Sequence, residues 1–217
     1  MELAINSTQE KMWKLALGFA NTAVLYALIK SEVVEELRFD AKTLDDLVYA
    51  CGLNPDVLFR TLRFAEVIEV IILQDGKYAL SDLGKLLLKD VPGSLYYGIL
   101  LAGSDPWQQA WHNLTYSLTI GENAFEAAMG TSFYDYIDRF KQYGDPYNRW
   151  MSISTNMSAN SIVEAYDFST IMSVCDIGGG QGVLLQTILS ENPHLQGILF
   201  DQSSVLETHI LTDLSDR

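Results

Sequence analysis

A cluster of glycines between two short apolar segments constrains this sequence more than any other feature. Residues 171–176 are apolar and end in an acid, residues 176–182 read Asp-Ile-Gly-Gly-Gly-Gln-Gly, and residues 183–189 form an apolar helical run. Residues 197–201 are a second apolar run that also ends in an acid. A strand, a glycine turn, a helix and a strand make one βαβ unit, which predicts two parallel strands with a right-handed crossover.

The glycine turn predicts a binding site for a small ligand. Glycine adopts positive φ angles, and its missing side chain lets a ligand approach the backbone. The helix that follows offers free N–H groups and partial positive charge at its N-terminus. Asp201 ends the second strand, 19 residues after Gly182, where a carboxylate can accept hydrogen bonds from both hydroxyls of a ribose.

The glycine spacing distinguishes between kinds of nucleotide ligand. Gly178 and Gly180 fit the dinucleotide fingerprint, but its third position holds the bulky Val183, and no Gly-Lys-Ser/Thr sequence of a phosphate loop follows. The acid Asp176 stands two residues before the first glycine. An acid before three alternating glycines, with a second acid at Asp201, is instead the pattern of sites for S-adenosylmethionine (SAM).

The first third of the chain predicts helices followed by a hairpin. Thr43 is an expected N-cap for a helix over residues 44–50 that ends at Gly52, and Asn54-Pro55 starts the next helix. Two strand-like runs, residues 67–73 and 77–80, flank an Asp-Gly turn, and a short helix is expected over 83–88. This order is that of a winged helix. Pro92-Gly93 marks the expected boundary, after which residues 95–166 are helical and rich in aromatic side chains.

Several segments resemble the dimeric plant-type and bacterial small-molecule O-methyltransferases, which include the caffeate and hydroxyindole enzymes. Residues 165–169 with 174–182 are similar to the approach to the first SAM motif, and 200–205 to the ribose-binding strand end. Residues 111–121, 125 and 130–136 are similar to the helical approach to the site. The resemblance implies a mixed α/β fold, with a winged-helix dimerisation domain in residues 1–93. Residues 94–217 would be a helical connector and the first βαβ of an incomplete class I Rossmann-like methyltransferase domain.

The resemblance also implies a function and a set of site residues. The function is transfer of a methyl group from SAM to a hydroxyl, phenolic in type, of a secondary metabolite. Gly178, Gly180 and Gly182 would line the methionine part of SAM, Asp201 would hold the ribose, and Asp176 would approach the amino group. The resemblance further implies three residues near the ligands: Gln202 beside the adenine, and Tyr136 and Met151 facing SAM or the acceptor.

The sequence assigns no catalytic base. In the family that the chain resembles, a histidine far beyond the ribose acid removes the acceptor proton. The histidines here are His112 in the helical region, His194 after a helix-ending proline, and His209 in an expected final helix, and none matches that position. Because the sequence continues for 16 residues after Asp201, it supplies two strands of an open sheet. We therefore expect a fragment, one part of a split enzyme, or a non-catalytic dimerising pseudoenzyme.

Charge and composition bear on partners and location. The 28 acidic and 14 basic residues give a net charge of −14, which disfavours nucleic acid and anionic membranes as partners. A winged-helix DNA regulator using Arg60 and Arg63 is therefore the second reading. Apolar stripes in residues 10–30 and 94–120 suit either a dimer interface or an intramolecular core, and the resemblance implies a homodimer. We expect no metal site, no disulfide, a buried Cys175, no membrane span, and a cytoplasmic protein.

Overall fold

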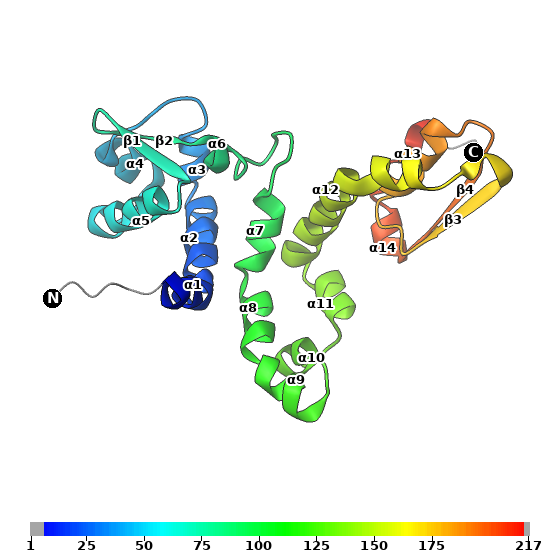
Figure 1. Ribbon diagram of the computed structural model, residues 1–217, viewed down its shortest axis with the longest axis horizontal. Helices are drawn as coiled ribbons and strands as arrows, with labels where there is room; N and C mark the ends of the chain where they lie inside the picture. Colours follow the sequence, from blue (N-terminus) through cyan, green and yellow to red (C-terminus); the bar gives the residue numbers. More distant parts are fainter. Residues whose placement is uncertain (1–6, 215–217) are drawn as a thin grey trace. The chain divides into compact units, whose positions relative to one another are not determined.

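The computed structural model describes residues 7–214 (Figure 1). The chain divides into two units, with the division in the sequence between Gly130 and Thr131. Helices predominate in both units. The sheets within the described residues are a two-stranded antiparallel pair in the N-terminal unit and a two-stranded parallel pair in the C-terminal unit.

The N-terminal unit is built from helices and one hairpin. Its core consists of apolar side chains that are almost fully buried, among them Leu28, Val33, Leu47, Leu62 and Ile71. In chain order the elements are α1 (Ser7–Ala16), α2 (Gly18–Lys30), α3 (Val33–Glu36), α4 (Leu44–Cys51), α5 (Pro55–Val67), β1 (Ile71–Gln74), β2 (Lys77–Leu80), α6 (Asp82–Lys85), α7 (Tyr96–Ala102), α8 (Asp105–His112), α9 (Leu114–Ile120) and α10 (Ala124–Met129).

The predicted hairpin is confirmed, with different bounds. β1 and β2 pair antiparallel around Asp75 and Gly76, whose φ angles of 52° and 76° suit a turn with two left-handed residues. The first strand was expected from residue 67, but Val67 ends α5, and Glu69 turns the chain with a φ of 63°. The helix expected over residues 83–88 is the four-residue α6.

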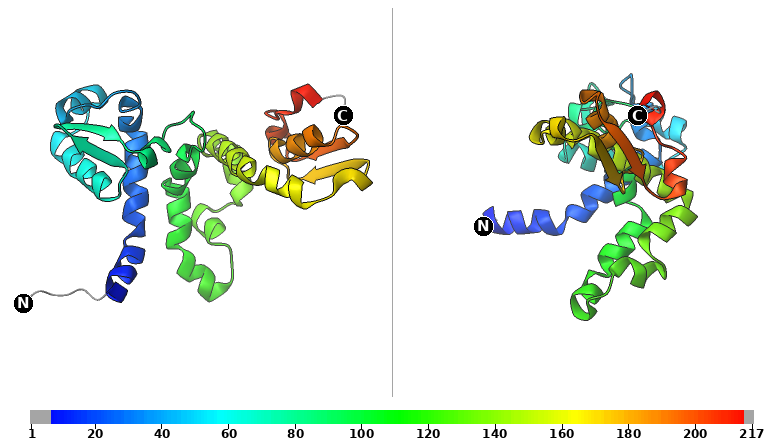
Figure 2. Two further views of the ribbon diagram at one scale, coloured as in Figure 1. Left: turned by 45° about the horizontal axis from the view of Figure 1, so that its top comes forward. Right: turned by 90° about the vertical axis from the view of Figure 1, so that its right-hand side faces the viewer.

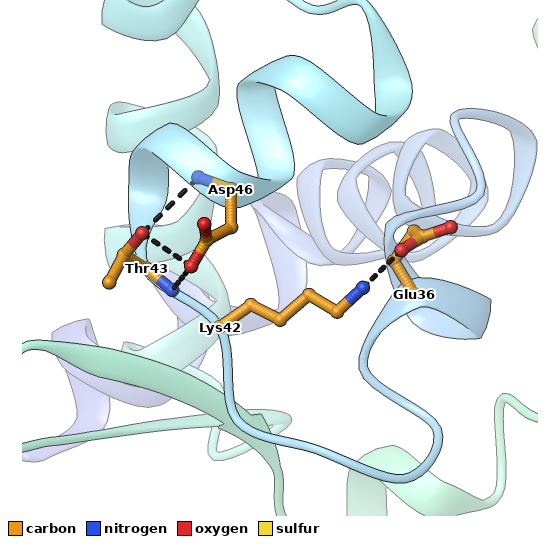
Figure 3. Close-up of polar contacts among 4 residues, drawn as sticks. All are labelled: Glu36, Lys42, Thr43 and Asp46. Atoms are coloured by element: carbon orange, nitrogen blue, oxygen red, sulfur yellow. Dashed lines mark hydrogen bonds and ion pairs between the residues drawn. The ribbon is translucent and has the colours of Figure 1, made fainter.

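The start of α4 is fixed by a capping box, as Figure 3 shows. The Asp46 backbone N–H donates to Thr43 Oγ1 at 3.2 Å, and the Thr43 N–H donates to Asp46 Oδ2 at 3.0 Å. These bonds satisfy donors that a helix start leaves open. Lys42, next to the cap, pairs with Glu36 and exchanges two backbone hydrogen bonds with Tyr78 of β2. The same short segment therefore ties α3 and α4 to the hairpin.

The contacts place residues 94–130 with the N-terminal unit, whereas the sequence predicts a boundary after residue 93. Packing of α7 on α2 explains this grouping. The backbone of Gly103, at the end of α7, approaches α2 so closely that a Cβ there would lie 2.4 Å from Tyr26 Cβ. Pro92-Gly93 is thus a turn inside the unit.

No single helix within residues 7–214 is long and apolar enough to cross a bilayer. The consecutive helices α1 and α2, bent by 44°, reach the length and hydropathy of one span only when taken together.

The C-terminal unit contains the predicted βαβ unit. β3 and β4 are parallel, in register from Ser173 opposite Gln196 to Ile177 opposite Phe200, which confirms the predicted parallel pair. Figure 2 gives two further views of the two strands and their connecting helix. The elements are α11 (Phe133–Arg139), α12 (Lys141–Ala165), the 3₁₀ turn η1 (Phe168–Thr170), β3 (Ser173–Ile177), α13 (Val183–Glu191), β4 (Gln196–Phe200), α14 (Ser203–Leu206) and η2 (Leu211–Leu214).

The two faces of the β3–β4 pair differ. One face packs against α13, where Leu185 and Leu189 are buried and a Cβ on Gly197 would lie 2.8 Å from Leu189 Cδ1. The other face exposes Ile177, Ile198 and Phe200, at 77%, 57% and 64% of their surface. Cys175 points to this second face, because side chains alternate along a strand. The expectation that Cys175 is buried is therefore wrong.

Candidate functional site

The glycine loop between β3 and α13 has backbone φ angles that are unfavourable for residues other than glycine. Gly178, Gly180 and Gly182 have φ angles of 73°, 59° and 88°, in the left-handed region that L side chains disfavour. The Gly178 N–H donates to the carbonyl of Phe200 at 2.8 Å, which closes the loop onto the end of β4. Gly182 is the N-cap of α13. The glycines are therefore required by the turn itself.

Asp201 lies beside this loop, directly after β4. Its Oδ2 accepts a hydrogen bond from the Gly180 N–H at 2.8 Å, and its Oδ1 accepts one from the Gln202 N–H at 2.7 Å. Two backbone donors hold the carboxylate in place, while each oxygen keeps a further lone pair. Asp201 can therefore accept additional hydrogen bonds from a ligand.

Asp176, at the end of β3, is the second carboxylate of the site. Its Oδ2 is buried and has no hydrogen-bond partner within the described part of the chain. Burial raises the pKa of this carboxyl above its ordinary value, and the negative charge of Asp201 raises that pKa further. A buried acceptor without a partner is costly. A ligand with a cationic donor would satisfy it.

A cavity of about 940 Å³ opens over these groups, lined by residues of the C-terminal unit. Its walls come from the glycine loop, from α11 and α12, and from the segment after β4. Polar and aromatic residues line it, among them Tyr134, Asp138, Lys141, Tyr147, Arg149, Ser152, Gln181, Asp201, Gln202 and Thr208. Its size fits a nucleoside-containing ligand with room for a second small molecule.

The structure brings most of the sequence-predicted site residues to this cavity. The residues that line it are Asp176, Gly178, Gly180, Asp201, Gln202 and Met151. Gly182 lies behind the wall, where a Cβ would meet Leu211 at 3.1 Å. Tyr136 is not among the lining residues; its ring packs against Phe140 at a centroid distance of 4.6 Å.

Sequence reasoning missed the tyrosine pair Tyr134 and Tyr147. Burial raises the pKa of Tyr147 to about 12, with further contributions from the charge of Tyr134, a hydrogen bond with it, and the charge of Asp201. The Tyr147 phenol therefore stays protonated and can act as a hydrogen-bond donor in the cavity. The aromatic stretch in this region was visible in the sequence, but aromatic residues at helical spacing are equally typical of a core.

None of the three histidines lines the cavity. His194 contacts the Phe168 carbonyl through Nε2 at 3.3 Å, and His112 ends α8 in the N-terminal unit. His209 was expected in a final helix, but it lies between α14 and η2, where its Nδ1 accepts from the Leu211 N–H. Within residues 7–214 no three His, Cys, Asp or Glu side chains gather closely enough to hold a metal ion.

Comparison with known proteins shows which proteins this chain is similar to. The sequence profile of the O-methyltransferase domain matches residues 111–212, which include the glycine loop and Asp201. Phenazine O-methyltransferase PhzM of Lysobacter antibioticus is 31% identical over 191 residues, covering 88% of this chain and 56% of that protein. The chain carries an O-methyltransferase domain. Its relatives are bacterial and plant small-molecule O-methyltransferases.

Further O-methyltransferases match in sequence and in structure. Caffeic acid 3-O-methyltransferase of Capsicum annuum is 29% identical over 226 residues, covering 94% of this chain and 63% of that protein. The solved structure of mitomycin 7-O-methyltransferase MmcR superposes with a TM-score of 0.88 at 27% identity, over 96% of this chain and 63% of that one. CalO1, a methyltransferase in calicheamicin biosynthesis with bound S-adenosylhomocysteine, gives a TM-score of 0.77 at 30% identity, over all of this chain and 65% of that one. The chain thus spans less than two thirds of the length of these methyltransferases.

Proposed function

We propose that the cavity of the C-terminal unit binds S-adenosylmethionine and that the protein transfers its methyl group to a hydroxyl of an aromatic or polyketide-like small molecule. The observation that carries the proposal is the meeting of Asp176, the glycine loop and Asp201 around one cavity. The relatives support it, since their names describe O-methylation of phenazine and caffeic acid, and the CalO1 structure contains S-adenosylhomocysteine.

The residues present suit the two ends of this cofactor. Asp201 would accept hydrogen bonds from the ribose hydroxyls through its free lone pairs. The orphaned Oδ2 of Asp176 would accept from the ammonium group, and this pairing would offset the cost of its burial. Gly178 and Gly180 would let the methionine part approach the loop, with Gln202 near the adenine and Met151 on the α12 wall. Tyr136 does not line the cavity, and it would support the cavity wall through the contacts of its ring with Phe140 and Tyr143.

Methyl transfer then requires three conditions from the chain. When bound, SAM supplies a methyl group on a positively charged sulfur, and the acceptor oxygen forms a bond to that carbon as the carbon–sulfur bond breaks. The chain must hold the acceptor in line, exclude water, and take up the acceptor's proton. The tyrosines and Met151 offer an apolar wall for a flat acceptor. We assign no base among the described residues.

Calorimetric titration with S-adenosylhomocysteine tests the cofactor site. We expect binding by the wild type and loss of the heat in Asp201→Ala, because the ribose would lose a charged acceptor, at a cost of ~2–3 kcal/mol. Asp167→Ala is the matched control, since the Asp167 carboxylate also accepts a backbone N–H, from Ser169 at 2.9 Å, but does not line the cavity. A wild type that gives no heat, or equal losses in the two variants, would overturn the cofactor proposal.

A product screen with radiolabelled SAM and a panel of phenols separates enzyme from pseudoenzyme. Label in an O-methyl product supports the transferase. Binding of S-adenosylhomocysteine without transfer to any acceptor supports the alternative of a non-catalytic dimerising protein. Label on nitrogen or carbon alone would contradict the choice of a hydroxyl acceptor.

We also propose that residues 1–93 form a winged-helix domain that dimerises with a second copy of the chain. The order α3, α4, α5, β1, β2 suits a winged helix. Apolar side chains that a stable monomer would bury are exposed on α1 and α2, including Trp13 at 66% and Phe19 at 67%. An obligate interface covers about 2,000 Å² or more, so several helices must take part. Sedimentation of the wild type and of Trp13→Lys with Phe19→Glu tests this, and a wild-type monomer at micromolar concentration would refute it.

The described contacts of α5 do not favour a DNA-binding regulator as the function of the same unit. The two cations of α5 are engaged locally: Arg60 donates to the Asp56 carbonyl at 3.2 Å, and the Arg63 guanidinium lies over the Phe59 ring. A recognition helix needs polar and basic side chains free to reach bases. Binding to DNA at low salt that weakens steeply with added salt would reverse this preference.

We further propose that the protein works in the cytoplasm. Cys51 and Cys175 are free thiols that lie in different units. Unpaired cysteines are typical of a reducing compartment. Fractionation of the producing cells checks the location.

A further inference from the structure

The side chain of Gln181, inside the glycine loop, joins segments that are far apart in the sequence. Its Oε1 accepts a hydrogen bond from Ser152 Oγ of α12 at 2.7 Å. Its Nε2 donates to the Thr208 carbonyl at 3.1 Å and to Thr208 Oγ1 at 3.0 Å. Ser152, Gln181 and Thr208 all line the cavity.

The chemistry of the partners fixes the orientation of this amide. The Thr208 carbonyl can only accept a hydrogen bond, so the NH₂ group of Gln181 must face it. The oxygen of the amide then faces Ser152, whose hydroxyl can donate. Both ends of the side chain are satisfied in this orientation, whereas in a flipped amide the oxygen would face the Thr208 carbonyl, which cannot donate.

Backbone bonds hold the segment after α14 against the same loop. The Ile210 N–H donates to the Gln181 carbonyl at 3.0 Å, and Thr208 Oγ1 donates to the Val205 carbonyl at 2.9 Å. Thr208 and Ile210 both face the cavity. The Gln181 amide therefore reinforces a contact whose loss would widen the cavity between the glycine loop and this segment.

We propose that Gln181 is a positioning residue of the cofactor site, one that sets the spacing of α12, the glycine loop and residues 208–210. This inference rests on the proposed function, because the spacing matters for cofactor binding. Gln181 acts through Ser152 and Thr208, and its role is to keep the cavity at the width that the cofactor requires. Gln181 can have this role because the neighbouring glycines have no side chain that could anchor the loop.

The test uses the full chain and two measurements. The first is hydrogen exchange of the Ile210 amide without ligand, in the wild type, Gln181→Ala and Gln181→Glu. We expect faster exchange in both variants, because alanine removes the amide and a glutamate places a carboxylate against the Thr208 carbonyl. Gln142→Ala, at an exposed position of α12, is the matched control and should leave this exchange unchanged.

The second measurement is the dissociation constant of S-adenosylhomocysteine. We expect it to rise about tenfold in Gln181→Ala, the loss of one to two net hydrogen bonds. Ser152→Ala should weaken binding and Ser152→Thr should restore it, because threonine keeps the hydroxyl. This rescue distinguishes positioning from a general loss of stability, which thermal unfolding of the same variants reports.

The outcomes separate the two proposals. If the wild type binds and Gln181→Ala leaves both the affinity and the Ile210 exchange within about twofold, the positioning role is refuted while the cofactor site stands. If the wild type does not bind, the proposed function fails and the positioning role fails with it. In that case, faster exchange of the Ile210 amide in Gln181→Ala would show only that the Gln181 hydrogen bonds stabilise the fold, with no role in cofactor binding.

Discussion

Gly179 lies so close to the carboxylate of Asp176 that a Cβ on it would be 2.6 Å from both Cγ and Oδ2 of that acid. The same Cβ would lie 2.6 Å from Leu199 Cδ1. Real Cβ atoms do not approach other atoms so closely, so the substitution must move the acid, the leucine or the loop. Gly179 is therefore the glycine that sets where Asp176 can be.

We predict that Gly179→Ala abolishes binding of S-adenosylhomocysteine while the chain remains folded. Gly130→Ala is the control, because Gly130 does not line the cavity and a Cβ there meets nothing within 4 Å and adds only the strain of a φ of 72°, about 1–2 kcal/mol. Calorimetry measures binding, and circular dichroism verifies the fold. Unchanged affinity in Gly179→Ala would mean that the position of Asp176 does not matter to the ligand.

The raised pKa of Asp176 predicts a pH dependence of stability. Because the folded state binds this proton more tightly than the unfolded state, its contribution to stability is full below the ordinary pKa of 3.8. That contribution is lost as the pH rises through the raised folded value. Asp176→Asn should therefore stabilise the C-terminal unit increasingly across this window, and weaken binding of S-adenosylhomocysteine.

Hydrogen exchange of the β3 amides, measured at several pH values, reports the free energy of opening of this unit. Asp167→Asn provides a contrast of opposite sign. Hydrogen bonds from Ser169, first from its side chain and then from its backbone, lower the pKa of Asp167, so its contribution is present above the ordinary pKa and lost as the pH falls through the folded value. If both asparagine variants respond to pH in the same direction, the explanation by burial of Asp176 is wrong.

The part of the site closest to the glycine motif was predictable from the sequence. When a strand is followed by glycines with positive φ angles and then by a helix, the backbone of the connecting loop has few possible conformations. A βαβ unit also places the end of its second strand beside that loop. Asp176 and Asp201 follow from this topology. The capping box at Thr43 and the end of α4 at Gly52 were predictable for a similar reason, because each depends on residues within a few positions.

The other cavity residues and the grouping of the helices into units depend on tertiary contacts, which the periodicity of the sequence does not encode. Tyr134, Ser152 and Thr208 reach the cavity because α11, α12 and the segment after β4 pack around it, and no local pattern distinguishes them from core residues. The grouping of residues 94–130 with the N-terminal unit likewise depends on α7 meeting α2 at Gly103. Cys175 was expected to be buried, but it lies on the exposed face of the β3–β4 pair, which the apolar run of residues 171–176 does not reveal.

Gly84 in α6 should be essential to the N-terminal unit. A Cβ there would lie 2.1 Å from the Val70 carbonyl oxygen and 3.1 Å from its carbon, and both are backbone atoms that cannot swing away. We expect Gly84→Ala to cost 3 kcal/mol or more, roughly the scale of strong overpacking. Gly18→Ala, with open space around it in α2, should be neutral or stabilise by about 0.5–1 kcal/mol. Urea unfolding followed at the hairpin amides measures both, and similar values for the two variants would contradict the predicted close packing.

The open face of the β3–β4 pair should make the protein bind hydrophobic probes, since Ile177, Ile198 and Phe200 form one apolar surface. Ile198→Lys should reduce the fluorescence of a bound hydrophobic dye and change the unfolding free energy by no more than about 0.5 kcal/mol. The neighbouring Leu199→Lys is the control. Leu199 faces α13 and packs against the core, so a lysine there would place a charge among buried side chains and should cost more than about 2 kcal/mol. Equal effects on stability would mean that the two faces of the sheet are covered alike.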